Sequence, residues 1–294
     1  MNKPLNNIRI LDLTHMLSGP YGAMILADLG AETIKVEPLH GEGTRKLLAS
    51  DPKNSLDGMG AYYITLNRNK KSVALNLKSE QGLQVFYDLV RKADVVISNF
   101  GVGVPERLKI DYATLKDINP RIITCTVSGF GSDGPNPKRP AFDQVAQATG
   151  GGMSITGPDP DHPVRAGIPI GDLGGGMFAV MGILTALMER ESSGEGQHVD
   201  ISMLDCQVSM LNYMATMYFL SGEDPSASVQ RTVALDLAAI VGGCDPQVRI
   251  VTQTLELAGL RPGSDDDAVV RVRKPDRRRD GRPISTERRE HDEL

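Results

Sequence analysis

Residues 10–37 read ILDLTHMLSGPYGAMILADLGAETIKVE and contain one complete strand–helix–strand pattern. The apolar run Arg9–Leu13 predicts a buried strand, and Tyr21–Leu29 has the spacing of a helix. Thr33–Glu37 predicts a second strand. Because strands that alternate with helices usually pair in parallel, this stretch predicts the first unit of an α/β sheet.

The same alternation continues as far as Leu220. Ser79 is the expected N-cap of the second predicted helix. Further strands are predicted at Ser72–Leu77, Asp94–Asn99, Arg121–Val127 and Gln197–Met203, and further helices at Gln81–Lys92, from Asp172 to about Glu191, and at Gln207–Leu220. We therefore expect an α/β fold in which a Rossmann-like parallel sheet is flanked by helices.

The composition argues against several classes of function. The chain has 294 residues, a formal net charge of −5 and 40% hydrophobic residues, which allows a sizeable core but does not suit a nucleic-acid surface. No run of about 18 apolar residues and no secretory signal are visible, so we expect a cytoplasmic protein without a membrane span. The cysteines fit neither a disulfide framework nor a zinc site, and we expect no metal; they are Cys125, Cys206 and Cys244.

The loops of the predicted sheet differ in what they offer a ligand. Residues 14–20, THMLSGP, lack the G-x-G-x-x-G pattern of dinucleotide sites. Residues 66–72, LNRNKKS, contain three cations, and residues 99–107, NFGVGVPER, combine glycines that allow close backbone approach with Arg107. A solvated turn explains the first of these loops and a plain strand–helix connection the second. Taken together, the two loops predict an anionic ligand, since ligands of open α/β sheets bind beyond the carboxyl ends of the strands.

One carboxylate stands alone in an apolar segment. Residues 167–177 read GIPIGDLGGGM, and Asp172 is their only charged residue. Glycines 174–176 remove side chains where another group approaches the backbone, and their N–H groups are candidates to stabilise a developing negative charge. His162 and His198 lie in polar contexts without a serine or cysteine nucleophile nearby in the sequence, so no catalytic triad is indicated. We interpret Asp172 as the residue that carries the chemistry.

Five ordered motifs resemble a known family. They are residues 10–37, 66–72, NFGVGVPERL at 99–108, AFDQVAQATGGGMSITG at 141–157, and residues 167–177. In this order they resemble the class III CoA-transferases, the family of formyl-CoA transferase and carnitine CoA-transferase. The resemblance covers about three quarters of the chain.

The resemblance implies a reaction. Asp172 is the nucleophile of the family: it attacks the carbonyl of an acyl-CoA donor and forms a mixed anhydride, which the released CoA thiolate converts to an aspartyl-CoA thioester. An acceptor carboxylate then repeats the sequence in reverse. The implied substrates are an acyl-CoA and a small carboxylic acid, and residues 141–203 are most similar to members that act on dicarboxylic acids such as succinate and glutarate.

The resemblance also implies the residues that bind CoA. The positions that match the family's CoA-contacting loops are His15, Met16, Leu17, Ser18, Arg68, Asn69, Lys70, Lys71, Asn99, Phe100 and Arg107. Phe142 and Asp143 match a pair beside the active site, and Met203 matches a residue that lines it. Formyl-CoA transferase has an arginine where this chain has Pro38, so we expect Lys35 or Arg45 to supply that cation.

Two alternatives remain open. α-Methylacyl-CoA racemases resemble this chain at Asp172, but they carry a histidine where this chain has Phe142, and a racemase needs two bases. The second alternative is an inactive fragment that still binds CoA weakly, because the final part of the sequence departs from the family.

That departure concerns residues 223–294, which we set apart from a CoA-transferase large domain at residues 1–222. Aromatic residues are absent after Phe219, and residues 271–282 read RVRKPDRRRDGR. Such a composition predicts a largely disordered tail in place of the family's small domain and return segment. We hypothesise a shifted reading frame near residues 225–228, and we expect that the interlocked homodimer of the family does not form in the same way here.

Overall fold

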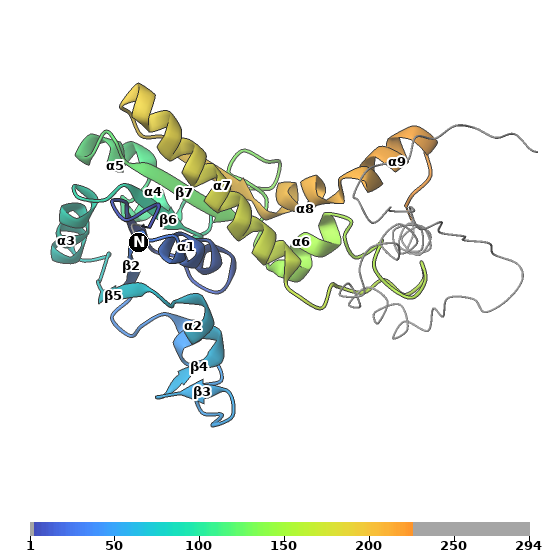
Figure 1. Ribbon diagram of the computed structural model, residues 1–294, viewed down its shortest axis with the longest axis horizontal. Coiled ribbons are helices and arrows are strands. Elements are labelled where there is room, and N and C mark those ends of the chain that lie inside the picture. The colour runs from blue at the N-terminus through green and yellow to red at the C-terminus, as the bar shows by residue number, and fades with distance from the viewer. Residues whose placement is uncertain (1–2, 226–294) are drawn as a thin grey trace, which may run out of the picture. The chain divides into compact units, whose positions relative to one another are not determined.

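The structure is a computed structural model that describes residues 3–225 (Figure 1). The expected α/β fold with a parallel sheet is confirmed. The tail expected at residues 223–294 lies outside the described residues from 226 onward. The strands are β1 (Arg9–Asp12), β2 (Glu32–Glu37), β3 (Ser55–Leu56), β4 (Met59–Gly60), β5 (Lys70–Ala74), β6 (Val95–Ser98), β7 (Ile123–Ser128) and β8 (His198–Ser202). The helices are α1 (Ser18–Asp28), α2 (Ala61–Leu66), α3 (Glu80–Val90), α4 (Val104–Leu108), α5 (Tyr112–Ile118), α6 (Asp143–Thr149), α7 (Ile170–Ser193), α8 (Met203–Leu211) and α9 (Tyr213–Ser221), with a short 3-10 turn at Gly43–Arg45.

Six of the strands form one sheet in the order β5-β2-β1-β6-β7-β8, and all neighbouring pairs are parallel. The chain builds one half of the sheet outward from β1 and then returns to build the other half from β6. The strand order therefore reverses between β1 and β6. In open α/β sheets, ligands bind outside the carboxyl ends of the strands at such a reversal.

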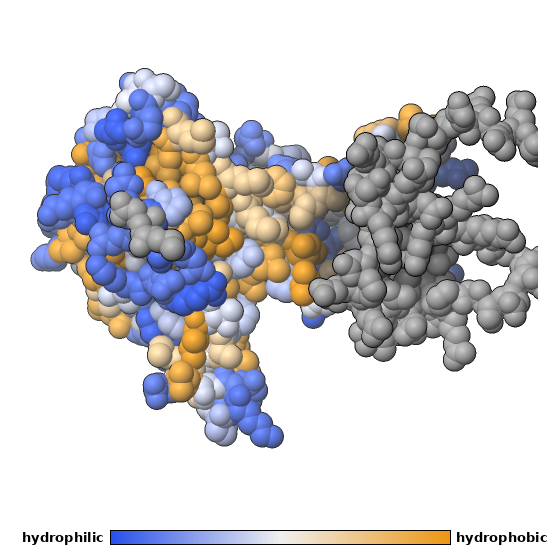
Figure 2. All heavy atoms as spheres, viewed as in Figure 1, coloured by the Kyte–Doolittle hydropathy of each residue, from blue (hydrophilic) through white to orange (hydrophobic). Residues whose placement is uncertain are grey.

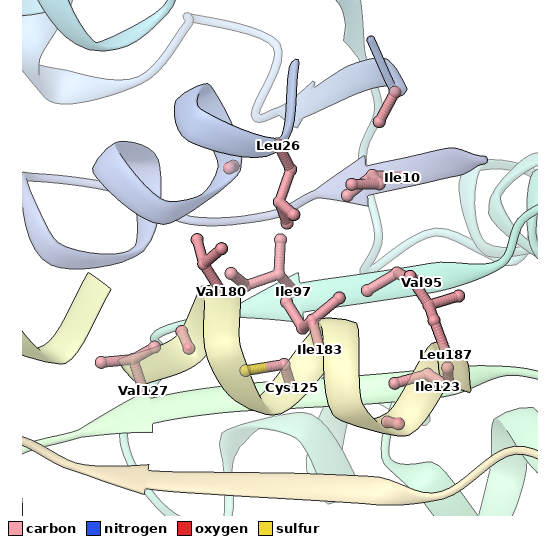
Figure 3. Packing of buried hydrophobic residues seen from close by; sticks show 14 of the residues in the cluster. Ile10, Leu26, Val95, Ile97, Ile123, Cys125, Val127, Val180, Ile183 and Leu187 are labelled. Carbon is pink, nitrogen blue, oxygen red and sulfur yellow. The ribbon is translucent and has the colours of Figure 1, made fainter. Parts of the chain in front are cut away.

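One face of the sheet is covered by α1 and α7. Figure 3 shows Leu26 of α1 and side chains of α7 meeting the apolar residues of the central strands. The labelled residues of this cluster are Ile10, Leu26, Val95, Ile97, Ile123, Cys125, Val127, Val180, Ile183 and Leu187. The opposite face is covered by α3 and α5, whose Phe86, Val90 and Leu115 are fully buried. Both faces of the sheet are apolar, as parallel sheets require.

Helix α7 passes very close to α1. A Cβ atom placed on Gly22 would lie 2.8 Å from the carbonyl oxygen of Gly176, and one placed on Gly176 would lie 2.6 Å from that of Ser18. Glycine is needed here because a side chain on either helix would separate the two backbones. By length and hydropathy alone α7 is long and apolar enough to cross a membrane, but half of its most apolar stretch of 18 residues is buried inside the protein. Figure 2 shows hydrophobic surface along α7, where Met177, Met181 and Met188 are exposed.

Several element boundaries differ from those expected. Helix α1 begins at Ser18, three residues before the predicted start, because a proline at position 20 fits the first turn of a helix. Strand β5 begins at Lys70 instead of Ser72. The single helix expected over Gln207–Leu220 is divided into α8 and α9 at Asn212, whose φ is +50°. The predicted N-cap is confirmed: the Ser79 side chain accepts a hydrogen bond from the backbone N–H of Gly82.

An ion pair is buried beneath the carboxyl end of β1. Lys70 Nζ lies 2.8 Å from Asp12 Oδ2, and the two side chains are 1% and 0% exposed. Lys70 Nζ also donates to the Pro20 carbonyl oxygen and to Asn67 Oδ1, so its three protons all have acceptors. Burial acts to raise the pKa of Asp12, but the charges of Lys70 and Lys35 outweigh it and hold that pKa below its usual value. The pair connects β5, β1 and the first turn of α1.

Removing one member of this pair should destabilise the fold strongly. In Lys70→Met the Asp12 carboxylate stays buried without its cation, so the free energy of unfolding should fall by about 3–5 kcal/mol. Lys71→Met is the matched control, because the neighbouring Lys71 pairs with Glu32 at the surface and its loss should cost about 1 kcal/mol or less. Urea unfolding followed by circular dichroism measures both. Equal losses in the two variants would contradict a structural role for the buried pair.

Candidate active site

Nine of the residues expected at the site line one pocket of about 260 Å³ at the carboxyl edge of the sheet. We call it the Asp172 pocket. The turn after β1, the start of α1 and the loop after β6 contribute one part of the lining, and α7, α8 and the segment before α6 contribute another. The nine residues are His15, Met16, Leu17, Ser18, Asn99, Phe100, Phe142, Asp172 and Met203. The structure thus brings together motifs that are more than 180 positions apart in the chain.

The turn that follows β1 is held by side chains. We call residues 14–16 the strap. Its backbone hydrogen bonds begin at Thr14, whose N–H donates to Asp12 Oδ1 over 2.9 Å and whose carbonyl oxygen accepts from Lys35 Nζ over 2.7 Å. Both Asp12 and Lys35 are buried. Because a buried backbone group without a partner is costly, these two side chains fix the path of the chain as it leaves the sheet.

Asn99 and Glu42 hold the rest of the strap. The His15 N–H donates to Asn99 Oδ1 over 2.9 Å, and Asn99 Nδ2 donates to the His15 carbonyl oxygen over 2.7 Å. The Met16 N–H donates to Glu42 Oε1 over 3.1 Å, and Met16 has a left-handed φ of +63°. Five successive backbone groups are therefore bound by side chains from four places in the sequence. The strap is a well-defined wall of the site because these five backbone groups are bound by side chains of the protein.

Asp172 lies in the first turn of α7, where Asp143 caps the helix. Asp143 Oδ1 accepts hydrogen bonds from the N–H groups of Gly171 over 2.8 Å and of Asp172 over 3.3 Å. Asp143 itself is buried, and its Oδ2 accepts a hydrogen bond from Gln147 Nε2 over 2.8 Å. The carboxylate of one helix thus satisfies free N–H groups of another. This contact fixes the backbone of Asp172 relative to α6.

Burial, followed by the charge of Asp143, raises the pKa of Asp172 to about 6. The position near the amino end of α7 acts in the opposite direction, because that end of a helix favours negative charge. Asp172 is therefore mostly ionised at pH 7. Tyr62 lines the same pocket, and burial, followed by the charge of Asp172, raises the pKa of its phenol to about 12. Burial lowers the pKa of His15, which keeps the imidazole neutral at pH 7.

Five of the expected CoA-binding residues do not line the Asp172 pocket. Arg68 and Asn69 both contact Asp28 at the carboxyl end of α1. Lys70 is buried against Asp12, and Lys71 pairs with Glu32. Arg107 is exposed on α4 and forms no ion pair within residues 3–225. Residues 68–71 stand at the amino end of β5, away from the ligand edge, and their side chains all contact acidic partners within the protein.

Neither cation expected to replace the family arginine at Pro38 is free. Lys35 is buried and donates to the strap at the Thr14 carbonyl oxygen. Arg45 forms two hydrogen bonds to Glu37, with Nη2 to Oε1 at 2.6 Å and Nε to Oε2 at 2.7 Å. Both side chains therefore have partners within the protein, and the expectation that one of them serves the ligand stays a prediction.

The glycine run after Asp172 has a packing role. Residues 174–176 lie in the second turn of α7, where backbone N–H groups bond to carbonyls one turn earlier. A Cβ on Gly174 would lie 2.5 Å from Met210, and one on Gly175 would lie 2.7 Å from Ser18 Oγ. These glycines admit α1 and α8 to the surface of α7, and their N–H groups are not available to an oxyanion.

Sequence reasoning missed a second pocket, of about 630 Å³. We call it the Lys78 pocket. It shares His15, Met16 and Phe100 with the Asp172 pocket, so the two adjoin. Its other lining residues include Pro38, His40, Leu75, Asn76, Leu77, Lys78 and Leu108. The sequence feature that could have indicated this pocket is the alternation of apolar and polar residues in LNLK at 75–78, directly after the carboxyl end of β5. Tyr62, Lys138 and Arg139 were also missed in the Asp172 pocket.

Within the described part of the chain, no group of three or more histidine, cysteine or acidic side chains is arranged to hold a metal ion. Cys125 and Cys206 are buried and free, and Cys244 lies outside the described residues.

Residues 5–251 match CoA-transferase family III. The match extends past residue 222, where the sequence suggested that similarity to the family ends. The chain is 42% identical over 225 residues to acetyl-CoA:oxalate CoA-transferase of Acetobacter aceti, which covers 76% of this chain and 57% of that protein. It is 40% identical to succinyl-CoA:mesaconate CoA-transferase of Haloarcula marismortui (76% and 57% covered) and 38% identical to human succinyl-CoA:glutarate CoA-transferase (76% and 50% covered). The chain thus spans about half the length of the curated relatives it matches.

Solved structures give the same result. A CAIB/BAIF family protein from Brucella suis aligns with a TM-score of 0.73 and 36% identity, covering 77% of this chain and 60% of that chain. Rv3272 from Mycobacterium tuberculosis aligns with a TM-score of 0.66 and 32% identity, covering 75% and 59%.

The charge of Asp143 can be separated from its capping contact. Asp143→Asn keeps Oδ1 as an acceptor for the α7 N–H groups but removes the charge, so the pKa of Asp172 should fall below about 6 while burial still holds it above its usual value. Asp143→Ala removes the cap as well and should also cost about 1 kcal/mol of stability. A carbon-13 NMR titration of the Asp172 carboxyl measures the pKa. An unchanged pKa in Asp143→Asn would show that the Asp143 charge does not act on Asp172.

Proposed function

The chain belongs to CoA-transferase family III, and from this membership we propose that it transfers CoA from an acyl-CoA to a small carboxylic acid through a thioester on Asp172. The observation that carries the proposal is the placement of this carboxylate. Asp172 is the acidic residue of a pocket that apolar side chains and the strap line on one side, and its backbone is held by Asp143. A nucleophile must be ionised, oriented and shielded from water, and this setting supplies all three conditions.

The proposed transfer makes and breaks only carbon–oxygen and carbon–sulfur bonds. An Asp172 oxygen attacks the thioester carbonyl, the C–S bond breaks, and a CoA thiolate and a mixed anhydride form. The thiolate then attacks the Asp172 carboxyl carbon, which releases the donor acid as a carboxylate and leaves the aspartyl-CoA thioester. An acceptor carboxylate reverses both steps. No proton moves at any stage, so the chemistry does not require His15 or any other side chain to act as a general base.

We place the two ends of the acyl-CoA in the two adjoining pockets. The reacting thioester lies at Asp172, and the pantetheine arm passes the strap at His15, Met16 and Phe100. The nucleotide end then enters the Lys78 pocket, where Leu75, Leu77 and Leu108 offer apolar contact to a base and Lys78 offers a cation. Lys78 is exposed and forms no ion pair within residues 3–225. In this arrangement Lys78 supplies the positive charge that the family arginine at position 38 would give.

The racemase alternative is less well supported by the pocket. Phe142 lines it where a racemase would need a base, and its side chain is 66% exposed. A phenylalanine cannot accept or return a proton, so the position that holds the histidine of a racemase carries no base here. Transfer through Asp172 requires no second base.

The donor and acceptor acids are part of the proposal. The similar proteins are named for oxalate, mesaconate and glutarate, which are all dicarboxylic acids. Three further expectations from the sequence stay predictions: the division of the chain at residue 222, the altered homodimer, and the cytoplasmic location.

Intact mass measurement tests the reaction in the chain as it exists. Incubation with succinyl-CoA should raise the protein mass by one CoA less one water, and hydroxylamine should remove the adduct. Asp172→Asn should form none, because an amide does not attack the thioester. If the chain binds CoA but forms no adduct, it is the inactive fragment and the proposed function is wrong. Exchange of the α-proton of a 2-methylacyl-CoA in deuterated water would instead support the racemase.

The proposed nucleotide end has its own test. Lys78→Gln should weaken CoA binding about five- to tenfold, because a charge-assisted contact to phosphate is lost from an exposed site. Lys92→Gln, at the exposed end of α3 outside both pockets, is the control and should bind CoA like the unmodified protein. Isothermal titration calorimetry measures both. Equal affinity in Lys78→Gln and the control would exclude the Lys78 pocket as the nucleotide site.

A further inference from the structure

Two cations line the Asp172 pocket that the proposed transfer steps do not use. Lys138 and Arg139 are exposed residues of the segment that precedes α6. Neither forms an ion pair in the part of the chain that the structure describes. Arg45, another cation near the ligand edge, is neutralised internally by Glu37. The pocket therefore has a carboxylate in the first turn of α7 and two free positive charges on another wall.

The guanidinium of Arg139 is held in place by an aromatic ring. Its central carbon lies 5.1 Å from the centroid of the Phe130 ring, and its backbone N–H donates to the Asn136 carbonyl oxygen over 3.1 Å. Contact with a ring uses the flat face of a guanidinium and leaves its N–H groups free at the edge. A carboxylate is the group that matches this edge, because it accepts two parallel hydrogen bonds.

The two cations stand apart from the proposed path of CoA. The Asp172 pocket meets the Lys78 pocket at His15, Met16 and Phe100, and none of the residues from 137 to 142 lines the Lys78 pocket. If the thioester enters past the strap and reacts at Asp172, its acyl group lies against the wall formed by residues 137–142. Arg139 also borders a shallower hollow that contains Arg165, which adds positive charge on that side.

We propose that Arg139, assisted by Lys138, binds the second carboxylate of a dicarboxylic acid while the first carboxylate reacts at Asp172. This inference rests on the proposed function for the identity of the reacting group. It makes Arg139 a specificity-determining residue: it contacts the end of the acid that does not react. A monocarboxylic acid of the same length would leave the guanidinium without an anionic partner, so the site should select against it.

The experiment compares glutarate with pentanoate, which has the same chain length and one carboxylate fewer. Binding of each acid to the CoA-saturated protein is measured by calorimetry, so that no turnover is needed. The unmodified protein should bind glutarate at least tenfold more tightly than pentanoate. Arg139→Gln should remove that preference by weakening glutarate alone, and Arg139→Lys should restore part of it. Lys138→Gln should have a smaller effect, because Lys138 lacks the contact with Phe130.

Each outcome decides a different question. If Arg139→Gln weakens both acids equally, or weakens CoA itself, Arg139 does not read the second carboxylate and the inference is wrong. If the aspartyl adduct forms from succinyl-CoA but glutarate binding is unchanged in Arg139→Gln, the inference fails and the proposed function stands. If glutarate binding depends on Arg139 but no adduct forms, the transferase proposal fails and the carboxylate site remains.

Discussion

The structure depends on how the chain leaves its first strand. At the point where the strand order reverses, the backbone of residues 14–16 must turn without the hydrogen bonds of a helix or a sheet. Asp12, Lys35, Glu42 and Asn99 supply those hydrogen bonds from their side chains. Asp12 ends β1 and Lys35 lies in β2, so the conformation of the turn depends on the pairing of these two strands. Both pockets share this turn as a wall, so the geometry of the site follows directly from the assembly of the sheet.

A second constraint acts at the amino end of α7. Two carboxylates, Asp143 and Asp172, lie at the same helix end, where free N–H groups favour negative charge. Asp143 takes the N–H groups, and Asp172 is left with the raised pKa that burial and its neighbour impose. The close packing of α1 on Gly176 holds the helix that carries the pair. The reactivity proposed for Asp172 thus depends on a contact between two helices that takes no part in the chemistry.

The fold was largely predictable because its strands are continuous apolar runs and its helices have amphipathic spacing. The walls of the Asp172 pocket were predictable from motifs: nine of the expected residues meet there. The role of the basic segment 66–72 stays a prediction, because residue type does not reveal which charges the protein neutralises itself. Arg68, Lys70 and Lys71 all have internal acidic partners, and these partners stand far away in the sequence. Tyr62 and Lys78 were missed because neither belongs to a run that is unusual in composition.

The positions of the cations without an acidic partner at the ligand edge therefore say more about the ligand than the net charge of the chain does. The chain is acidic overall, with a formal net charge of −5, yet the ligand edge presents Lys78 in one pocket and Lys138 and Arg139 in the other. A ligand with a single anionic group would leave one of these positions unmatched. A ligand with phosphates at one end and a carboxylate at the other would match both, with its uncharged middle at the strap. Such a charge distribution is the one that a CoA thioester of a dicarboxylic acid has.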